Sequence, residues 1–141
     1  MDFKDKDLNK LYEGALQGYK NAYAPYSKFQ VGACALLKNG EIIYGGNVEN
    51  ASYGLCNCAE RSTLFAAYSK GYRKDDIVAF MIIGRTDDVI SPCGACRQVM
   101  SELMNPDTPV YLTNLTGKIV KYKNSGLLPY NFTGDNLNEG L

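Results

Sequence analysis

Apolar side chains recur every three or four positions in the first part of the chain, which is the spacing of one face of an amphipathic helix. The positions that share this face are Leu8, Leu11, Tyr12, Ala15, Tyr19, Ala22 and Tyr23. Asp5 or Asp7 can cap the helix N-terminus. Pro25 ends the helix, because the residue before a proline avoids helical backbone angles. The pattern therefore predicts a helix over about Asp5–Ala24.

Apolar runs bounded by turn residues predict strands farther along the chain. Asn39-Gly40 lies between the first two runs, and both residues accept positive φ, so we expect a β-hairpin there. Thr116-Gly117 marks a second turn, between the last two runs. The predicted strands are Phe29–Leu37, about Glu41–Gly46, Ile77–Gly84, Pro109–Thr113 and Lys118–Lys123.

Two further helices separate these strands, one over Cys58–Lys70 and the other over Cys93–Met104. The tail holds at most a short helical turn near Leu127-Leu128. The order helix, hairpin, helix, strand, helix, strand, strand predicts an α/β fold. We expect one domain over residues 1–141, a three-layer α/β/α sandwich around one mixed sheet of about five strands.

Composition excludes several classes of protein. The 15 basic and 15 acidic residues give a formal net charge of zero, and no lysine or arginine stripe stands out. This argues against nucleic acid as a partner. No apolar run approaches the ~18 residues that a membrane helix needs, so we expect no membrane partner. The N-terminal segment has mixed charge and no apolar signal region, which indicates a cytoplasmic protein.

The chain has five cysteines and no histidine. The absence of histidine excludes Ser-His-Asp and Cys-His nucleophilic sites and every histidine-based metal site. An odd number of cysteines in a chain that is not secreted indicates thiols or metal ligands rather than disulfides. Cys34 lies in an apolar strand, where we expect an inert buried thiol.

The other cysteines gather at two predicted helix starts. Cys93 and Cys96 are three residues apart and share one helix face, and Cys58 begins the second helix. Helix N-termini favour thiolates, and three thiolates plus water form an open zinc site. Glu60 can reach back past the start of its helix, because helical side chains lean toward the N-terminus.

Three thiolates place about one excess negative charge on a zinc ion and its ligands. Arg61 and Arg97 each follow a cysteine in these helices. We expect at least one of them, more strongly Arg61, to donate a hydrogen bond to a thiolate. The alternative for either side chain is a solvated surface arginine.

The order Cys58-Ala59-Glu60 followed by Pro92-Cys93-Gly94-Ala95-Cys96 matches the general zinc-deaminase signature. Three more segments resemble the small homotetrameric cytidine deaminases, and the resemblance extends over about residues 10–137. These segments are Ala24-Pro25-Tyr26-Ser27-Lys28-Phe29-Gln30-Val31-Gly32-Ala33, Asn47-Val48-Glu49-Asn50-Ala51, and Leu127-Leu128-Pro129 followed by Phe132.

The resemblance implies that Cys58, Cys93 and Cys96 hold one Zn²⁺ per subunit. By the same resemblance, a zinc-bound hydroxide attacks C4 of cytidine or deoxycytidine, and Glu60 carries protons to N3 and to the leaving amino group. The Ala59 N–H is expected to bind the pyrimidine O2. The Ser91 carbonyl is expected to receive the departing ammonia.

The resemblance also implies a nucleoside site shared between subunits. Asn47 and Glu49 would bind the ribose and Phe29 would stack on the base. Taken alone, these three residues would be a turn residue, a solvated charge and core packing. Neighbouring subunits of a homotetramer would contribute Ala51, Tyr53 and Phe132.

Three other functions stay open at this stage. Cys56 with Cys58, Cys93 and Cys96 can form a closed four-cysteine structural zinc module. Cys93 and Cys96 can serve a thiol oxidoreductase, although that reading leaves Glu60 without a role. A related deaminase can act on another base, on a blasticidin-like nucleoside or on RNA, the last being disfavoured by the neutral charge.

Overall fold

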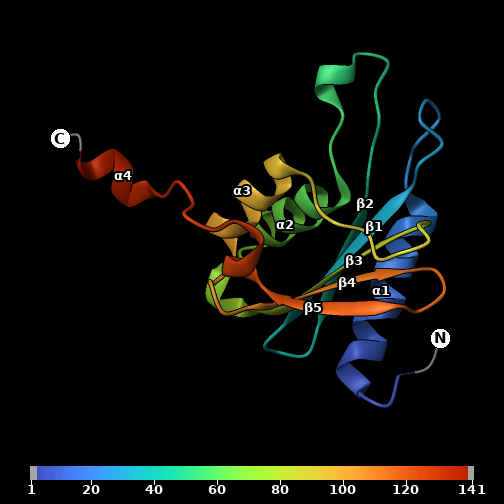
Figure 1. Ribbon diagram of the computed structural model, residues 1–141, viewed down its shortest axis with the longest axis horizontal. Coiled ribbons are helices and arrows are strands. Elements are labelled where there is room, and N and C mark those ends of the chain that lie inside the picture. The colour runs from blue at the N-terminus through green and yellow to red at the C-terminus, as the bar shows by residue number, and fades with distance from the viewer. Residues whose placement is uncertain (1–2, 140–141) are drawn as a thin grey trace.

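The computed structural model describes residues 3–139 and contains one five-stranded sheet (Figure 1). The strand order is β2-β1-β3-β4-β5. Their bounds are Val31–Leu37 for β1, Ile42–Gly46 for β2, Ile77–Gly84 for β3, Pro109–Asn114 for β4 and Ile119–Lys123 for β5. Strands β3 and β4 pair in parallel and the other neighbours pair antiparallel. The expected mixed sheet is confirmed.

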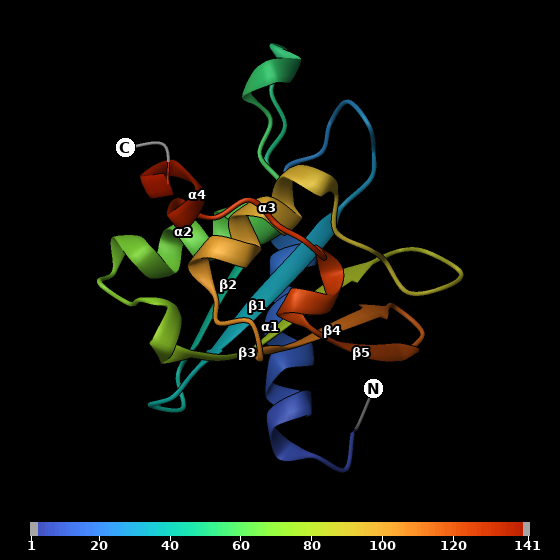
Figure 2. The same ribbon diagram turned by 60° about the vertical axis from the view of Figure 1, so that its left-hand side comes forward.

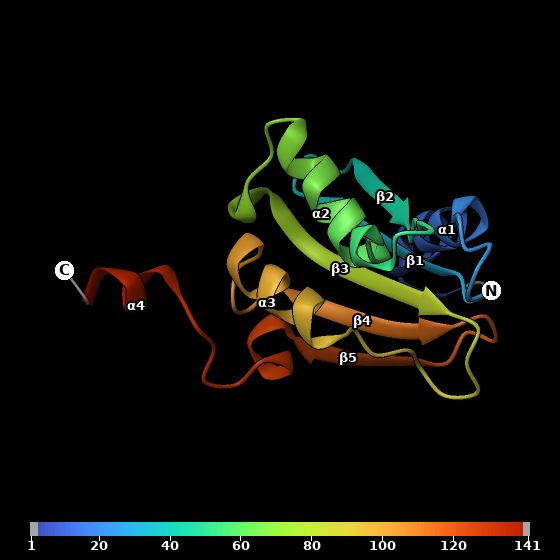
Figure 3. The same ribbon diagram turned by 90° about the horizontal axis from the view of Figure 1, so that it is seen from above.

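Helices cover both faces of the sheet, as Figures 1 and 3 show. Helix α1 (Lys6–Asn21) packs on the face that holds Cys34 and Leu36. Helices α2 (Ala59–Ser69) and α3 (Gly94–Leu103) pack on the opposite face. Because successive side chains of a strand point to opposite faces, the wholly apolar run of β1 supplies both layers of core.

The topology brings the starts of α2 and α3 to one edge of the sheet. Strand β2 is antiparallel to β1, and β1 is antiparallel to β3, so β2 and β3 run in the same direction. Helix α2 follows β2 and helix α3 follows β3 in the chain. Both connections therefore leave the sheet at the carboxyl edge of these strands, where α/β folds commonly place their ligands.

The first helix and first strand are shorter than the sequence pattern predicts. Strand β1 begins at Val31 rather than at Phe29. Asp5 caps α1 by accepting from the backbone N–H groups of Asp7 and Leu8, but the helix ends at Asn21 rather than Ala24. Beyond it, Tyr23 pairs with Val48 as an isolated bridge. The chain must leave the helix to make this contact.

Three short 3-10 turns, η1 (Tyr53–Leu55), η2 (Lys74–Asp76) and η3 (Asn124–Leu127), lie in the connections. A last helix, α4 (Gly134–Glu139), extends away from the sheet, as Figures 1 and 3 show, and overlaps α2 in the view of Figure 2. The sequence pattern does not predict this helix. Six residues are too few to display a helical period. Within residues 3–139, every helix is too short or too polar to cross a bilayer.

Helix α1 lies so close to β1 and β2 that glycine is required where they meet. A Cβ atom built on Gly32 would overlap the carbonyl oxygen of Ala15 and the backbone nitrogen of Tyr19. A Cβ atom on Gly46 would overlap the carbonyl oxygen of Gly18. Backbone atoms cannot rotate away as a side chain can, so an added methyl group must push the helix off the sheet.

We predict that Gly32→Ala lowers the free energy of unfolding by about 3 kcal/mol, near the upper end of the usual overpacking range. The matched control is Gly134→Ala, because a Cβ atom at Gly134 meets no atom within 4 Å and its φ is not positive. Urea unfolding followed by circular dichroism measures both variants. Equal midpoints would show that α1 moves aside without penalty.

Candidate active site

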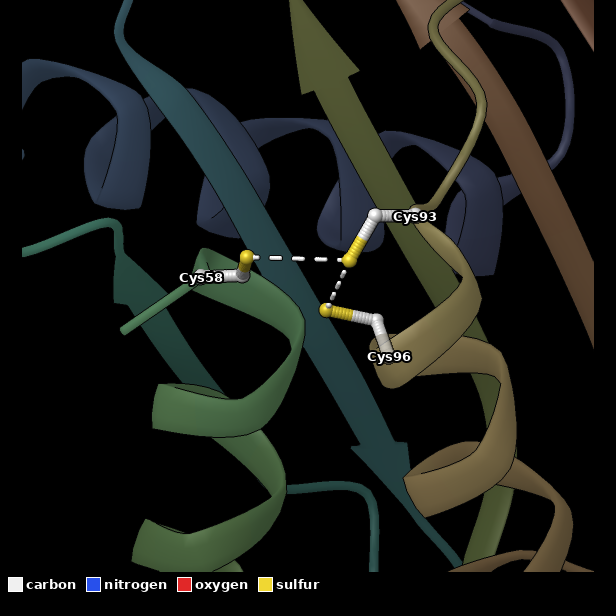
Figure 4. A group of neighbouring side chains, drawn as sticks. All are labelled: Cys58, Cys93 and Cys96. Carbon is white, nitrogen blue, oxygen red and sulfur yellow. Dashed lines mark hydrogen bonds between the residues drawn. The ribbon is translucent and has the colours of Figure 1, made fainter. Parts of the chain in front are cut away.

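Helices α2 and α3 each begin with a cysteine at the N-cap. Cys58 and Cys93 have the extended backbone angles of N-cap residues, yet neither sulfur accepts a capping hydrogen bond from a backbone N–H of its own helix. Their sulfur atoms instead point toward each other and toward Cys96 in the first turn of α3 (Figure 4). The first N–H groups of both helices therefore lack the side-chain cap that Ser, Thr or Asp would provide.

The three sulfur atoms are spaced as the corners of a metal site. The Cys58 and Cys93 sulfurs lie 3.9 Å apart, and the Cys93 and Cys96 sulfurs lie 3.4 Å apart. Tetrahedral zinc with bonds of about 2.3 Å places its sulfur ligands roughly 3.8 Å apart. No two of the sulfurs are bonded to each other, because all five cysteines are free. The donor set therefore fits Zn²⁺ with three protein ligands.

The surroundings favour a thiolate at Cys58. A hydrogen bond from Cys96 is the largest influence, and a hydrogen bond and charge from Arg61 add to it, so that the Cys58 pKa falls to about 5. The Cys96 pKa moves the other way, because this thiol donates to Cys58 and is buried. The protein thus prepares one thiolate, and a bound cation would ionise the remaining thiols.

The two arginines take different partners. The Arg61 guanidinium donates to the Cys58 sulfur at 3.3 Å. Arg97 makes no such bond and donates instead to Pro92 O, Leu127 O and Ser91 Oγ. Arg61 is therefore the arginine placed to offset thiolate charge.

Glu60 is buried in the first turn of α2 with 4% of its surface exposed. Burial raises the pKa of its carboxyl group, which also interacts with the Cys96 and Cys58 sulfurs. The two-residue offset from Cys58 thus keeps the carboxyl group beside the cluster rather than on the far side of the helix. A buried carboxyl group with a raised pKa is suited to holding and releasing a proton.

The remaining cysteines lie outside the cluster. The Cys56 sulfur accepts from the Asn50 backbone N–H at 3.3 Å, and among residues 3–139 the grouped sulfurs are those of Cys58, Cys93 and Cys96. A closed four-cysteine site is therefore not formed. Cys34 is fully buried, and desolvation raises its pKa to about 12, as expected for an inert thiol.

Asn47 and Glu49 both fasten the loop that carries Phe29. Asn47 accepts from the Val31 N–H and donates to the Phe29 carbonyl, each at 2.9 Å. Its side chain replaces a neighbouring strand at this point, which is why β1 begins at Val31 rather than Phe29. The Phe29 side chain stays 43% exposed. The structure thus brings together the three residues that the resemblance assigns to the nucleoside.

Ser27 connects Glu49 to the backbone of Phe29 and is not among the site residues predicted from the sequence. Its hydroxyl group donates to Glu49 and accepts from the Phe29 N–H at 3.0 Å. Hydrogen bonds from the Ser27 side chain and backbone lower the pKa of Glu49 and keep it ionised. The signal for this contact is local and weak, because any serine hydroxyl can bond the backbone two residues farther on.

Ala51, Tyr53 and Phe132 lie on exposed segments. Tyr53 is 75% exposed in η1, and with Tyr26 and Glu49 it lines a cavity of about 310 Å³. Phe132 is 57% exposed, and its carbonyl accepts from Gln98 on α3.

A family model described as the cytidine and deoxycytidylate deaminase zinc-binding region matches residues 5–112. The chain belongs to this family. A cytidine deaminase of Halalkalibacterium halodurans is 53% identical over 133 residues, covering 94% of this chain and 99% of the relative. One from Sporosarcina psychrophila is 44% identical over 131 residues, covering 93% and 95%.

Solved structures of the cytidine deaminase family share the fold. The crystal structure of cytidine deaminase from Burkholderia pseudomallei has a TM-score of 0.85 and 49% identity, covering 88% of this chain and 98% of that chain. The expected family, fold class and zinc-binding character are confirmed. The thiol oxidoreductase interpretation loses its basis, because the family signature assigns the same cysteines to zinc.

We predict that Cys58→Ala and Cys93→Ala reduce bound zinc from about one ion per chain to nearly none, because each removes one of three ligands. Cys56→Ala is the matched control and keeps its zinc. Atomic absorption of the purified variants measures the content. Zinc loss from Cys56→Ala would restore the four-cysteine interpretation.

Proposed function

We propose that the chain hydrolyses cytidine and deoxycytidine to uridine and deoxyuridine with release of ammonia. The observation that carries this proposal is the buried Glu60 carboxyl group beside a three-sulfur cluster. Three ligands leave a fourth position for water, which distinguishes a catalytic from a structural zinc site. The names of the relatives support cytidine as the substrate.

A Zn²⁺ ion held by Cys58, Cys93 and Cys96 would supply Lewis acidity to the attacking water. Glu60 would take one proton from that water and give it to N3 of the ring as the water oxygen adds to C4. Glu60 would then take the second proton from the new hydroxyl group and give it to the leaving amino group, which departs as ammonia. The burial of Glu60 beside the sulfur cluster supports one carboxyl group serving these positions in turn. The first backbone N–H of α2, that of Ala59, has no partner within the helix and is free to bind the pyrimidine O2.

The sugar would lie against the loop joined by Asn47, Glu49 and Ser27. The Glu49 carboxylate is ionised and exposed enough to exchange a Ser27 hydrogen bond for a ribose hydroxyl group. Phe29 offers its exposed ring to the base. A neutral protein with a compact site of this kind suits a free nucleoside better than a polynucleotide.

We predict that Glu60→Gln keeps its zinc but loses at least about 100-fold in kcat, because general acid–base catalysis contributes on that scale. Ammonia release from cytidine measures the loss. Glu13→Gln, an exposed position on α1, is the control and retains full turnover. A fully active Glu60→Gln would remove Glu60 from the mechanism.

We also propose that the chain acts in pyrimidine salvage in the cytoplasm as a homotetramer with shared sites. The exposed aromatic side chains support only the association of chains. Tyr53 and Phe132 lie on segments that stand out from the body of the chain. The resemblance implies that both residues, together with Ala51, contribute to the site of a neighbouring subunit. In one chain alone they expose apolar surface, which association would bury.

Mixed oligomers provide the test of shared sites. We predict that Glu60→Gln and Phe132→Ala chains, each of low activity, regain activity when they are co-expressed. Some sites then combine an intact Glu60 from one chain with an intact Phe132 from another. Size-exclusion chromatography with light scattering measures the four-chain mass. Co-expressed chains no more active than the average of the two variants would show that each site is built within one chain.

A further inference from the structure

The Arg97 side chain joins three separate segments of the protein. Its Nε donates to Pro92 O at 2.8 Å, one terminal nitrogen donates to Leu127 O at 2.8 Å, and the other donates to Ser91 Oγ at 2.5 Å. Ser91 and Pro92 immediately precede the Cys93 ligand. Leu127 comes from η3, thirty residues away in the chain.

All the acceptors are neutral oxygen atoms. None of the ion pairs within the described residues involves Arg97, so the side chain is not part of a charge pair. In the same part of the chain, Arg97 is the donor of every hydrogen bond accepted by Ser91 and Pro92. Just before this segment, Ile90 donates its N–H to Thr113 O at 3.3 Å. Between Ile90 and Cys93, the Arg97 guanidinium supplies the hydrogen bonds that Ser91 and Pro92 accept.

The far end of this link is itself fixed. Leu127 is 5% exposed, and Asn124 at the start of η3 is buried and donates to Met100 O at 2.8 Å in α3. Two contacts thus join α3 to η3. Asn124 of η3 bonds the C-terminal half of α3, and Arg97 in the first half of α3 bonds Leu127 of η3. A guanidinium bonded to such an anchor can hold the Ser91–Pro92 backbone in one place.

We propose that Arg97 is a positioning residue that holds the Ser91–Pro92 backbone against the three-sulfur cluster, so that the Ser91 carbonyl is aligned with the leaving amino group. The inference rests on the proposed deaminase function. Arg61, which contacts a sulfur, and Arg97, which contacts the loop, then have separate tasks. A shift of about 1 Å in such an acceptor is enough to slow turnover about 100-fold.

The planar shape of the guanidinium is essential to this role. Arginine presents its N–H groups as a rigid fork that can reach three oxygens at once, whereas lysine ends in a single ammonium group. Arg97→Lys keeps the charge and loses the fork. This variant therefore separates positioning from simple charge compensation of the thiolates.

The test compares steady-state deamination of cytidine by the full-length zinc-loaded protein and by Arg97→Lys. We expect kcat to fall at least about tenfold while KM changes less than about threefold and zinc content stays the same, the pattern of an interaction made in the transition state. The matched control is Arg73→Lys. Arg73 likewise donates to backbone carbonyls, those of Tyr68 and Tyr72, but it is the N-cap residue of η2 and is not part of the sulfur cluster.

A second variant, Arg97→Ala, leaves space for a free guanidinium. Added methylguanidinium is expected to restore part of its kcat, and to leave Arg73→Ala and Glu60→Gln unchanged. An Arg97→Lys enzyme with the kcat of the original chain, or loss of zinc in step with loss of kcat, would overturn the inference. An original chain that fails to release ammonia from cytidine would instead remove the proposed function.

Discussion

Two helices start at the same edge of the sheet with a sulfur atom where a capping oxygen would normally lie, and the site depends on this constraint. Replacing a capping oxygen typically costs a helix about 1 kcal/mol. At Cys58 and Cys93 the uncapped N–H groups and the positive ends of both helices face the sulfur cluster instead. Each helix loses some stability because its cap is missing. In return, the positive helix ends stabilise thiolates, and the thiolates favour binding of a cation.

The charges near the cluster are balanced by groups with separate tasks. Three thiolates around a divalent cation leave about one excess negative charge, which would make a bound water less acidic. Arg61 opposes this effect directly through its bond to the Cys58 sulfur. Burial raises the pKa of the Glu60 carboxyl group, so this group ionises less readily than an exposed glutamate. The same small volume thus holds three sulfur atoms, a cation that opposes their charge and a buried carboxyl group.

Patterns in the sequence are sufficient for the sheet, the main helices and the cysteines that cluster. Asn39-Gly40 predicts the hairpin, and the three-residue spacing of Cys93 and Cys96 predicts a shared helix face. The structure adds that β2 and β3 run in one direction, which brings Cys58 to the same edge of the sheet. Such features depend on local backbone preference and on alternation of apolar residues. The pattern of residues thus carries the framework of the site.

Contacts made by side chains across the fold could not be predicted in the same way. Arg61 and Arg97 occupy similar places after a cysteine, and only the three-dimensional path of η3 gives Arg97 a carbonyl at Leu127 instead of a sulfur. Asn47 was expected from the resemblance to face a sugar. Its bonds to Phe29 and Val31 depend on a pairing between loops distant in sequence. Long-range partners of this kind leave no periodic signal.

The loop that carries Phe29 is positioned by glycine residues that have no reactive side chain. Gly46 brings β2 against the carbonyl of Gly18 in α1, and Asn47 follows directly in the chain. A wider separation between α1 and β2 would move Asn47, and with it the Phe29 carbonyl to which its amide is bonded. The close approach of the helix to the sheet therefore helps to set the distance between Phe29 and the sulfur cluster. Close packing beneath this loop therefore restricts the positions that its side chains can take.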